Sequence, residues 1–518
     1  MSVNNLHQLI KSLSPTEKGY IKKQAGVHVI GEQNKYIKIF DAIDKQEEYN
    51  EKEILQKFKN EPILNNFSVA KNYLFNFILK SLESYHTTTK SELRSTLNHI
   101  DILYNKNLLF VAKKMLVKAK SIAQKHELYE FMEEIIDWEI ILLVEEATPQ
   151  NYLILVNKYF GELYDAMQKK KAIIDYKYLY QKMRAKSLYH GLARNDEDVI
   201  ELQKIIKTEA QIDEVSATFN EKFYKNLMLA NFLFVTNEQK KANELMEVNV
   251  KLMEKNPHMI ALKPSIYLSI LRNKAVNELS LMRYKPLFDT LKKMDDFTEK
   301  FGHKNRYFEI LKENLKLFVY LPTGQFDDAL EVAKNLDTLY KNLPQTKVFR
   351  KEKQLQQYAY AYIYIGLENY KLANQHINEL LNNNDFDFRS DLFCFAHILS
   401  LIVHFEMGNT ELLEYRTRST YQLLLKRDKL HKFEQEIIAF LKNSKHKKKN
   451  SAGWREDFIQ LKNSIEKITI DKIEKNALSL FDLISWLESK IENKSFMEIK
   501  QAKFNQLHAL ESSNAHMY

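Results

Sequence analysis

The chain contains 518 residues, of which only 10 are Gly and 8 are Pro, whereas average usage would give roughly 36 and 26. Because tight turns need residues that tolerate a positive φ or fix φ, this composition leaves little room for β-hairpins or glycine-rich phosphate loops. The formal charge of +9 is spread over 77 basic and 68 acidic residues, and only 12 of the basic residues are Arg. Bidentate recognition of phosphates and bases favours Arg. We therefore expect an all-α protein, and the composition disfavours nucleic acid as a partner.

The compartment is indicated by targeting signals and by cysteine content. The N-terminal sequence MSVNNLHQLIKSL has neither the basic n-region nor the apolar h-region of a signal peptide. No stretch approaches the roughly 18 apolar residues of a membrane span. The single cysteine, Cys394, excludes an intramolecular disulfide and fits a reducing cytosol. We predict a cytoplasmic protein without membrane contact.

Helix-start signals divide the N-terminal region. The sequence SPTE at residues 14–17 places Ser at an N-cap, Pro at the first helical position and Glu at the third, a combination that favours a helix start. Similar signals occur at residues 50–53 and 89–92. We interpret residues 1–90 as an N-terminal helical cap.

Two helices expected within this cap, over about 51–59 and 67–85, have a helix-turn-helix look. Lys71, Asn72 and Asn76 would lie near the start of the second helix. A recognition helix should be richer in Arg, Lys, Gln and Asn on one exposed face. The first hundred residues contain 14 basic and 11 acidic residues. This small excess of positive charge gives little indication of a DNA-binding surface. DNA contact by these helices is kept as an alternative.

A short pattern recurs in the second half of the chain. Residues 324–329, GQFDDA, combine a turn, an aromatic residue and, three positions later, a small residue. Residues 368–373, ENYKLA, repeat this arrangement 44 positions on. An apolar segment precedes each copy and ends in Tyr320 or Tyr364, six residues before the aromatic residue.

Weaker copies of the pattern occur on both sides of these two. The small or apolar position of each copy, which we call the anchor, recurs at intervals of 40 to 45 residues. The eight anchors are Ala112, Leu155, Val199, Ala242, Leu287, Ala329, Ala373 and Leu413. Each unit would hold two helices of about 18 residues, roughly 27 Å long. Since a helix pair with two apolar faces cannot bury both alone, neighbouring pairs should stack.

This arrangement resembles the tetratricopeptide repeat, in which the small residue lets the two helices approach closely and the aromatic residue fills the wedge between them. The resemblance covers residues 91–429, or about eight hairpins. The period exceeds the usual 34 or so residues, and the early Trp and the Leu-Gly pair are mostly absent. The resemblance implies a right-handed α-solenoid of antiparallel helix hairpins, with helical capping regions at residues 1–90 and 430–518.

In such arrays the first helix of each pair lines the concave surface, which is the usual binding groove. The matching positions carry side chains that suit a peptide. An Asn side chain can donate to and accept from a peptide backbone, and Arg can form two parallel hydrogen bonds with a carboxylate. Tyr provides a rigid contact surface. They are Arg184, Leu188, Leu227, Asn231, Arg272, Asn314, Phe318, Tyr358 and Tyr362. Tyr358 and Tyr362 share one helix face, whereas Tyr360 and Tyr364 share the other, which should pack inward. Longer helices could instead shift the register and bury several of these residues.

The sequence contains no signature of catalysis or cofactor binding. GxxxxGK[ST], GxGxxG, HExxH, GxSxG and paired CxxC motifs do not occur in it. Cys394, His397 and His404 would share a helix face, but zinc needs three or four ligands with a satisfied second shell, so we interpret them as packing residues. The basic run at 445–449 is interpreted as a solvated break before the C-terminal cap. We predict no catalytic residue, cofactor or metal.

The sequence therefore predicts a non-enzymatic scaffold or adaptor whose groove binds a protein or peptide segment. An alternative is a peptide-sensing transcriptional regulator with N-terminal DNA-contacting helices, a layout that resembles some bacterial peptide-responsive regulators. A third alternative, an enzyme with an unrecognised site, would need a pocket with convergent polar groups.

Overall fold

The computed structural model describes residues 5–27, 35–59, 66–144, 147–207, 218–300, 306–341, 347–382, 390–443 and 452–515. Within these ranges every regular element is an α-helix or a short 3₁₀ helix, so the predicted all-α class is confirmed. No helix in the same ranges is long and apolar enough to cross a membrane.

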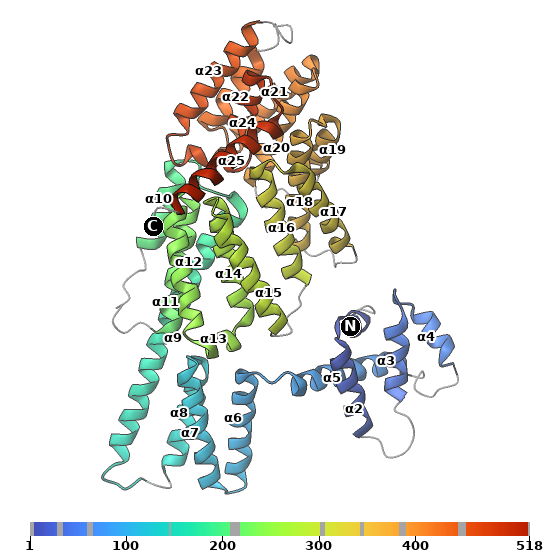
Figure 1. Ribbon diagram of the computed structural model, residues 1–518. Helices are drawn as coiled ribbons and strands as arrows, with labels where there is room; N and C mark the ends of the chain where they lie inside the picture. The colour runs from blue at the N-terminus through green and yellow to red at the C-terminus, as the bar shows by residue number, and fades with distance from the viewer. Residues whose placement is uncertain are drawn as a thin grey trace. The chain divides into compact units, whose positions relative to one another are not determined.

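The chain divides into two compact units, residues 1–160 and 161–518. This division differs from the boundaries near residues 90 and 429 that the sequence suggested. The first unit, drawn in blue to cyan in Figure 1, contains the first eight α-helices and the start of the ninth. Its helices are α1 (Asn5–Ser12), α2 (Pro15–Val27), α3 (Lys35–Lys45), α4 (Glu51–Lys57), α5 (Phe67–Tyr85), α6 (Thr89–Asn105), α7 (Leu109–Lys125), η2 (Tyr129–Phe131) and α8 (Met132–Leu143), and α9 (Tyr152–His190) continues into the second unit.

Helices α1–α5 bury a core of their own, which includes Ile10, Phe40 and Leu74. Two predicted helix starts in this part of the chain are confirmed. The hydroxyl of Ser14 accepts a hydrogen bond from the backbone N–H of Glu17, whose carboxylate accepts one from the Ser14 N–H. Asn50 caps α4 in the expected manner. Farther along, the cap of α6 is Thr88, one residue earlier than expected.

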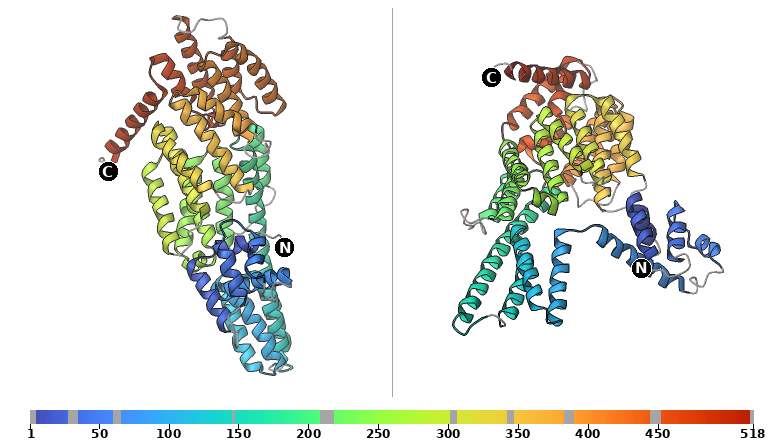
Figure 2. Two further views of the ribbon diagram at one scale, coloured as in Figure 1. Left: turned by 90° about the vertical axis from the view of Figure 1, so that its right-hand side faces the viewer. Right: turned by 60° about the horizontal axis from the view of Figure 1, so that its bottom comes forward.

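The second unit is a series of helix pairs that follow one another along the chain. From α11 on, neighbouring helices pack as hairpins, and each hairpin packs on the next, so this unit is a helical repeat array. In both views of Figure 2 its green-to-orange helices lie side by side. The helices are α10 (Asp196–Lys207), α11 (Phe219–Val235), α12 (Gln239–Glu254), α13 (Pro257–Leu262), α14 (Pro264–Ser280), α15 (Tyr284–Lys300), α16 (Arg306–Thr323), α17 (Phe326–Tyr340), α18 (Lys347–Gly366), α19 (Tyr370–Leu381), α20 (Ser390–Glu406), α21 (Thr410–Lys426), α22 (Lys432–Asn443), α23 (Ala452–Ile468), η4 (Glu474–Ser479), α24 (Leu483–Glu492) and α25 (Phe496–Ala515).

The anchors occupy one structural position throughout the chain. Each of the eight is the fourth residue of a helix, namely α7, α9, α10, α12, α15, α17, α19 or α21. Most of the anchor side chains are fully buried, including the four alanines. A small or compact side chain at this level lets the second helix of a hairpin lie close to the first. The sequence period therefore corresponds to a real structural repeat.

A left-handed residue precedes six of these helices, two positions before the first helical residue. The residues with positive φ are Asn107, Asn237, Met282, Gly324, Glu368 and Gly408. In each turn the N–H of the next residue donates to a carbonyl oxygen five residues earlier, for example Asn369 to Tyr364. This hydrogen bond is the Schellman closure of the preceding helix. The six turns therefore share one backbone geometry, although only two of their six left-handed residues are Gly.

One predicted hairpin has a different form. The anchors Leu155 and Val199 led us to expect two helices between them, but α9 is a single helix of 39 residues. No Gly with positive φ and no Pro interrupts α9, so nothing in its sequence ends the helix before His190.

A buried ion pair joins parts of the second unit that are far apart in sequence. The guanidinium of Arg194, between α9 and α10, donates to both carboxylate oxygens of Glu434 on α22, at 3.0 and 3.1 Å. It also lies 3.6 Å from Glu474 of η4. The side-chain amide of Asn476 donates to the carbonyl oxygen of Ala193 at 2.7 Å. Burial raises the pKa of Glu434, and the charge of Arg194 opposes this shift. These contacts hold the start of the array against its later hairpins.

The turn geometry predicts that Glu368→Gly stabilises the protein. A non-Gly residue in the left-handed region costs about 1–2 kcal/mol, part of which the greater freedom of Gly in the unfolded chain offsets. We expect the free energy of unfolding, measured by urea denaturation, to rise by about 0.5–1 kcal/mol. The control Glu331→Gly, at an exposed site inside α17, should lower it by about 1 kcal/mol. Equal losses in both variants would contradict the assignment of this turn.

Candidate functional site

The predicted groove residues lie on the first helices of successive hairpins. Arg184 and Leu188 are on α9, Leu227 and Asn231 on α11, Arg272 on α14, Asn314 and Phe318 on α16, and Tyr358 and Tyr362 on α18. Their side chains fall into two groups. Those on α16 and α18 are mostly buried, whereas Arg184 is exposed and Asn231 and Arg272 are half-buried.

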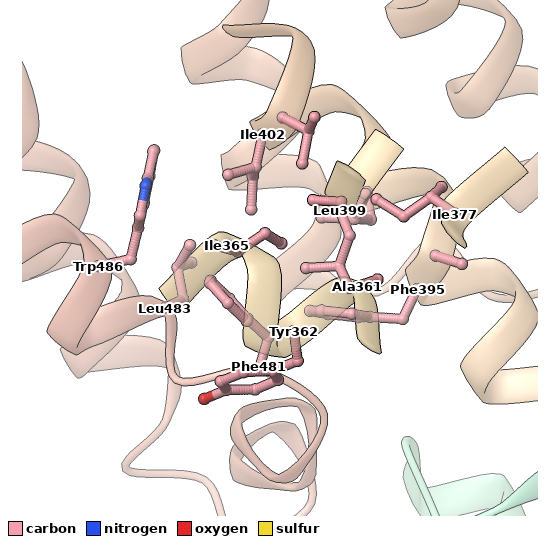
Figure 3. Close-up of a cluster of buried hydrophobic side chains, with 14 of the residues drawn as sticks. Ala361, Tyr362, Ile365, Ile377, Phe395, Leu399, Ile402, Phe481, Leu483 and Trp486 are labelled. Carbon is pink, nitrogen blue, oxygen red and sulfur yellow. The ribbon is translucent and has the colours of Figure 1, made fainter. Parts of the chain in front are cut away.

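The expectation that Tyr358 and Tyr362 face an open groove is wrong. Their side chains are only 4% and 6% exposed. Figure 3 shows Tyr362 beside Phe481 in a cluster of buried apolar side chains, with the two ring centroids 5.0 Å apart. The hydroxyl of Tyr358 donates to the carbonyl oxygen of Leu480 at 3.1 Å. The C-terminal segment of the chain therefore covers the face of α18 that the resemblance assigned to a partner.

A buried lysine also helps to cover this face of α18. Lys500 of α25 donates to Asp482 at 2.8 Å and lies 3.4 Å from the hydroxyl of Tyr362. Burial raises the pKa of the Asp482 carboxyl, but the charge and hydrogen bond of Lys500 outweigh it and hold the pKa below its usual value. The Tyr362 hydroxyl also accepts a hydrogen bond from the backbone N–H of Asp482. A charge pair this deep inside an apolar cluster fixes the position of α25.

The other buried candidates also have roles in packing. The side-chain amide of Asn314 donates to Tyr340 at 3.2 Å and to Glu352 at 3.1 Å, so it links α16, α17 and α18. Leu227 belongs to the apolar core around α11 and α14. Phe318 is partly buried against the core of the later hairpins. The longer helices thus turn several template positions inward.

Arg184 and Arg272 both lie close enough to Tyr180, a tyrosine that the sequence did not single out, for their charges to act on its hydroxyl. Burial raises the pKa of the Tyr180 hydroxyl, while the charges of Arg184 and Arg272 and a hydrogen bond with Asn273 lower it in part. Within the described residues neither arginine forms an ion pair. We call Tyr180, Arg184, Arg272 and Asn273 the arginine site.

The surroundings of the arginine site are aromatic and polar. Lys177 lies over the ring of Tyr224, 5.0 Å from its centroid. Burial raises the pKa of Tyr224, and its neighbour Tyr180 adds to the shift. Asn231, seven residues after Tyr224 on α11, shares its helix face. Its buried Oδ1 atom accepts no hydrogen bond within the described part of the chain. The region therefore offers cations, amide groups and aromatic faces to an anionic, partly apolar ligand.

Helical spacing could have revealed part of this site. Lys177, Tyr180 and Arg184 follow one another at intervals of three and four residues, which places them on one face of α9. The partnership with Asn273 depends on how α14 packs against the earlier helices, so no local pattern indicates it.

Cys394 and His404 are buried in α20, and His397 is half-buried there. Among the described residues no group of His, Cys, Asp and Glu is arranged to hold a metal ion. Burial raises the pKa of the Cys394 thiol to about 11. Burial, assisted by the charge of Arg416, lowers the pKa values of His397 and His404 to about 4. His404 is 2% exposed and lies 3.2 Å from the side-chain amide of Asn409.

The N-terminal helices with the helix-turn-helix look are α4 and α5. Lys71, one of the residues considered for DNA contact, forms an ion pair with Glu51 at 2.7 Å. Asn72 and Asn76 are exposed on α5. The basic run at 445–449 lies outside the described residues.

The buried histidines predict that the protein loses stability in mild acid. Because the folded pKa of His404 is about 4 and its ordinary value is 6.5, the unfolded chain binds the proton first as the pH falls. Stability is complete above pH 6.5 and is lost as the pH falls towards 4, by about 1.4 kcal/mol per pH unit for one such histidine. Urea denaturation at pH 7 and pH 5 should show this loss, and His404→Gln should reduce it. An unchanged pH dependence in the variant would contradict the burial of a neutral His404.

The chain was also compared with known proteins. No family model matches it, and no curated protein sequence matches it either.

Proposed function

We propose that the protein is a non-enzymatic scaffold or adaptor that binds a segment of another protein at the arginine site. One observation carries the proposal. Two arginines from different hairpins, Arg184 and Arg272, converge on Tyr180, and neither forms an ion pair within the described residues. A guanidinium that is held beside a partly buried aromatic ring without a counter-ion favours an anionic ligand.

The chemistry of the site suits a carboxylate that belongs to a peptide. Arg forms parallel hydrogen bonds to both oxygens of a carboxylate. Asn231 and Asn273 can each donate to and accept from a peptide backbone. The rings of Tyr180 and Tyr224 supply rigid contact area at a small cost in conformational entropy. A partner would therefore present an acidic side chain or a chain terminus next to an apolar residue.

This proposal places the partner on the first hairpins of the array and not along its whole length. The later first helices, α16 and α18, are covered by other parts of the chain, including α25. The right-handed course of the array, implied by the resemblance to tetratricopeptide repeats, and a cytoplasmic location are part of the same proposal.

We expect Arg184→Ala and Arg272→Ala each to reduce partner capture by at least about tenfold. Each substitution removes one of the two guanidinium groups of the proposed anion site. The measurement is affinity purification with mass spectrometry from the native cell, with wild type and variants in parallel. The far-UV circular dichroism and the melting temperature should stay near those of the wild type, since Arg184 is exposed and Arg272 is half-buried.

The matched control is Arg418→Ala, which removes an exposed arginine of α21 that pairs only locally with Glu414. It should capture the same partners as the wild type. If both arginine-site variants also capture the full set, the site assignment is wrong.

A further inference from the structure

The outward face of α9 carries a regular pattern of its own, which lies within the second unit. From residue 164 to residue 188, side chains that stay at least partly exposed recur at alternating steps of three and four residues. They are Tyr164, Met167, Lys171, Ile174, Tyr178, Gln181, Ala185 and Leu188, which we call the α9 seam. Three of them are large and more than half exposed, namely Tyr164 at 65%, Ile174 at 51% and Tyr178 at 53%.

The spacing of the α9 seam indicates the shape of the partner. Alternating steps of three and four residues average 3.5, which is the period of the positions where one helix packs along another in a coiled coil. The opposite face of α9 is already packed against the protein, where Ala166, Ile173, Tyr176, Leu179 and Met183 are buried. The outward face therefore has the spacing that a further helix needs. An extended peptide, whose side chains alternate every two residues, does not match it.

Cations flank the seam along its length. Lys170, Lys177 and Arg184 recur every seven residues, so they form one row beside the seam. Each directly precedes a seam residue and is therefore level with it. Within the described residues neither Lys170 nor Arg184 forms an ion pair. On the other side of the seam, Lys182 lies over the ring of Tyr178, 4.3 Å from its centroid.

The one acidic residue that directly flanks the seam is already paired. Asp175, on the same side as Lys182, forms an ion pair with Lys171 of the seam at 2.7 Å. The charge that remains on both flanks is therefore positive. A helix that complements this face carries carboxylates on the two flanks of its own apolar seam.

A second copy of α9 does not meet this requirement. In an antiparallel pair of α9 helices, the row from Lys170 to Arg184 would face its own counterpart. In a parallel pair, Lys177 would face Lys182 of the other copy. Both arrangements bring like charges together, so the face favours a different, acidic helix.

The arginine site borders the same row of cations. Tyr180 lies three residues after Lys177 and four before Arg184, which places it next to the row on the side away from the seam. A helix that packs on the seam would therefore bring the carboxylates of one flank to Arg184.

We propose that the partner segment of the arginine site is an acidic amphipathic α-helix that packs along the α9 seam. Its apolar residues cover Tyr164, Ile174 and Tyr178. Its carboxylates pair with the row of cations from Lys170 to Arg184. This inference rests on the proposed function, because Arg184 belongs to both, and it assigns the anion to side chains of a helix and not to a chain terminus.

The test measures the binding of synthetic peptides to the full chain by fluorescence anisotropy. The first peptide is about four heptads long, with Leu and Ile at its seam positions and Glu on its flanks, where like charges keep it from pairing with itself. The second carries Lys in place of Glu, and the third has the composition of the first in scrambled order. The Glu peptide should bind at least about tenfold more tightly than the other two, and its binding should weaken as salt is added.

Two double variants separate the seam from its flanks. Ile174→Ala combined with Tyr178→Ala should weaken binding of the Glu peptide at least about tenfold, because it removes the centre of the seam. Lys170→Glu combined with Lys177→Glu should exchange the preference, so that the Lys peptide binds more tightly than the Glu peptide.

The matched controls lie elsewhere in the second unit. Tyr415→Ala removes an exposed tyrosine of α21, and Lys334→Glu with Lys371→Glu reverses two exposed lysines. Both should bind the Glu peptide as the wild type does. Equal binding of the Glu and scrambled peptides, full binding by the seam variant or an unchanged preference in the charge-reversal variant would each overturn the inference. Displacement of the Glu peptide by a single-stranded oligonucleotide at equal concentration would do the same.

Partner capture from the native cell separates this inference from the proposed function. We expect the seam variant to lose capture together with Arg184→Ala and Arg272→Ala. Loss of capture in the two arginine variants alone would keep the arginine site and overturn the helical partner. Full capture by all three would overturn both.

Discussion

A helix hairpin with apolar residues on two faces cannot bury both within itself, and the architecture of this protein depends on that constraint. Each hairpin of the array buries one face internally, where an anchor such as Ala329 or Ala373 allows close approach. The other face is buried only when the next hairpin stacks on it. The left-handed turns matter for the same reason, because they close the first helix of a hairpin with the same hydrogen bond each time. Stability is therefore shared along the array, and no single hairpin could hold its conformation alone.

Stacking alone leaves the array open, and buried charge pairs mark the places where distant segments close on it. Arg194 with Glu434 joins residues 240 positions apart. Lys500 of α25 pairs with Asp482, which precedes α24, and lies 3.4 Å from the hydroxyl of Tyr362 on α18. Such pairs add little net stability relative to apolar packing, but a mispaired alternative leaves a buried charge unmatched. They specify which segment docks where. The unpaired arginines of the arginine site differ from these pairs, and this contrast is the reason for assigning them to a ligand.

Sequence periodicity was sufficient for the repeat and insufficient for the groove. The anchors could be found because a small residue at a helix crossing leaves a local trace, and all eight occupy the same helical position. Tyr358, Tyr360, Tyr362 and Tyr364 alternate between two faces of α18, so both faces carry aromatic side chains and no periodicity shows which of them is outward. One face of α18 is covered by α25, which lies far from it in the sequence. The sequence of α18 alone does not indicate this contact. Asn273 could not be singled out from local sequence, because its partner Tyr180 lies on another helix.

The most direct test of the account is the free energy of unfolding of variants with enlarged anchors. Ala242→Leu, Ala329→Leu and Ala373→Leu each insert a larger side chain at a fully buried position of a hairpin, and each should lower the free energy of unfolding by about 1–3 kcal/mol. The same change at Ala185, an exposed alanine of α9, should alter it by no more than about 0.5 kcal/mol. Anchor variants as stable as the Ala185→Leu control would show that the hairpins do not close at these positions and would contradict the repeat.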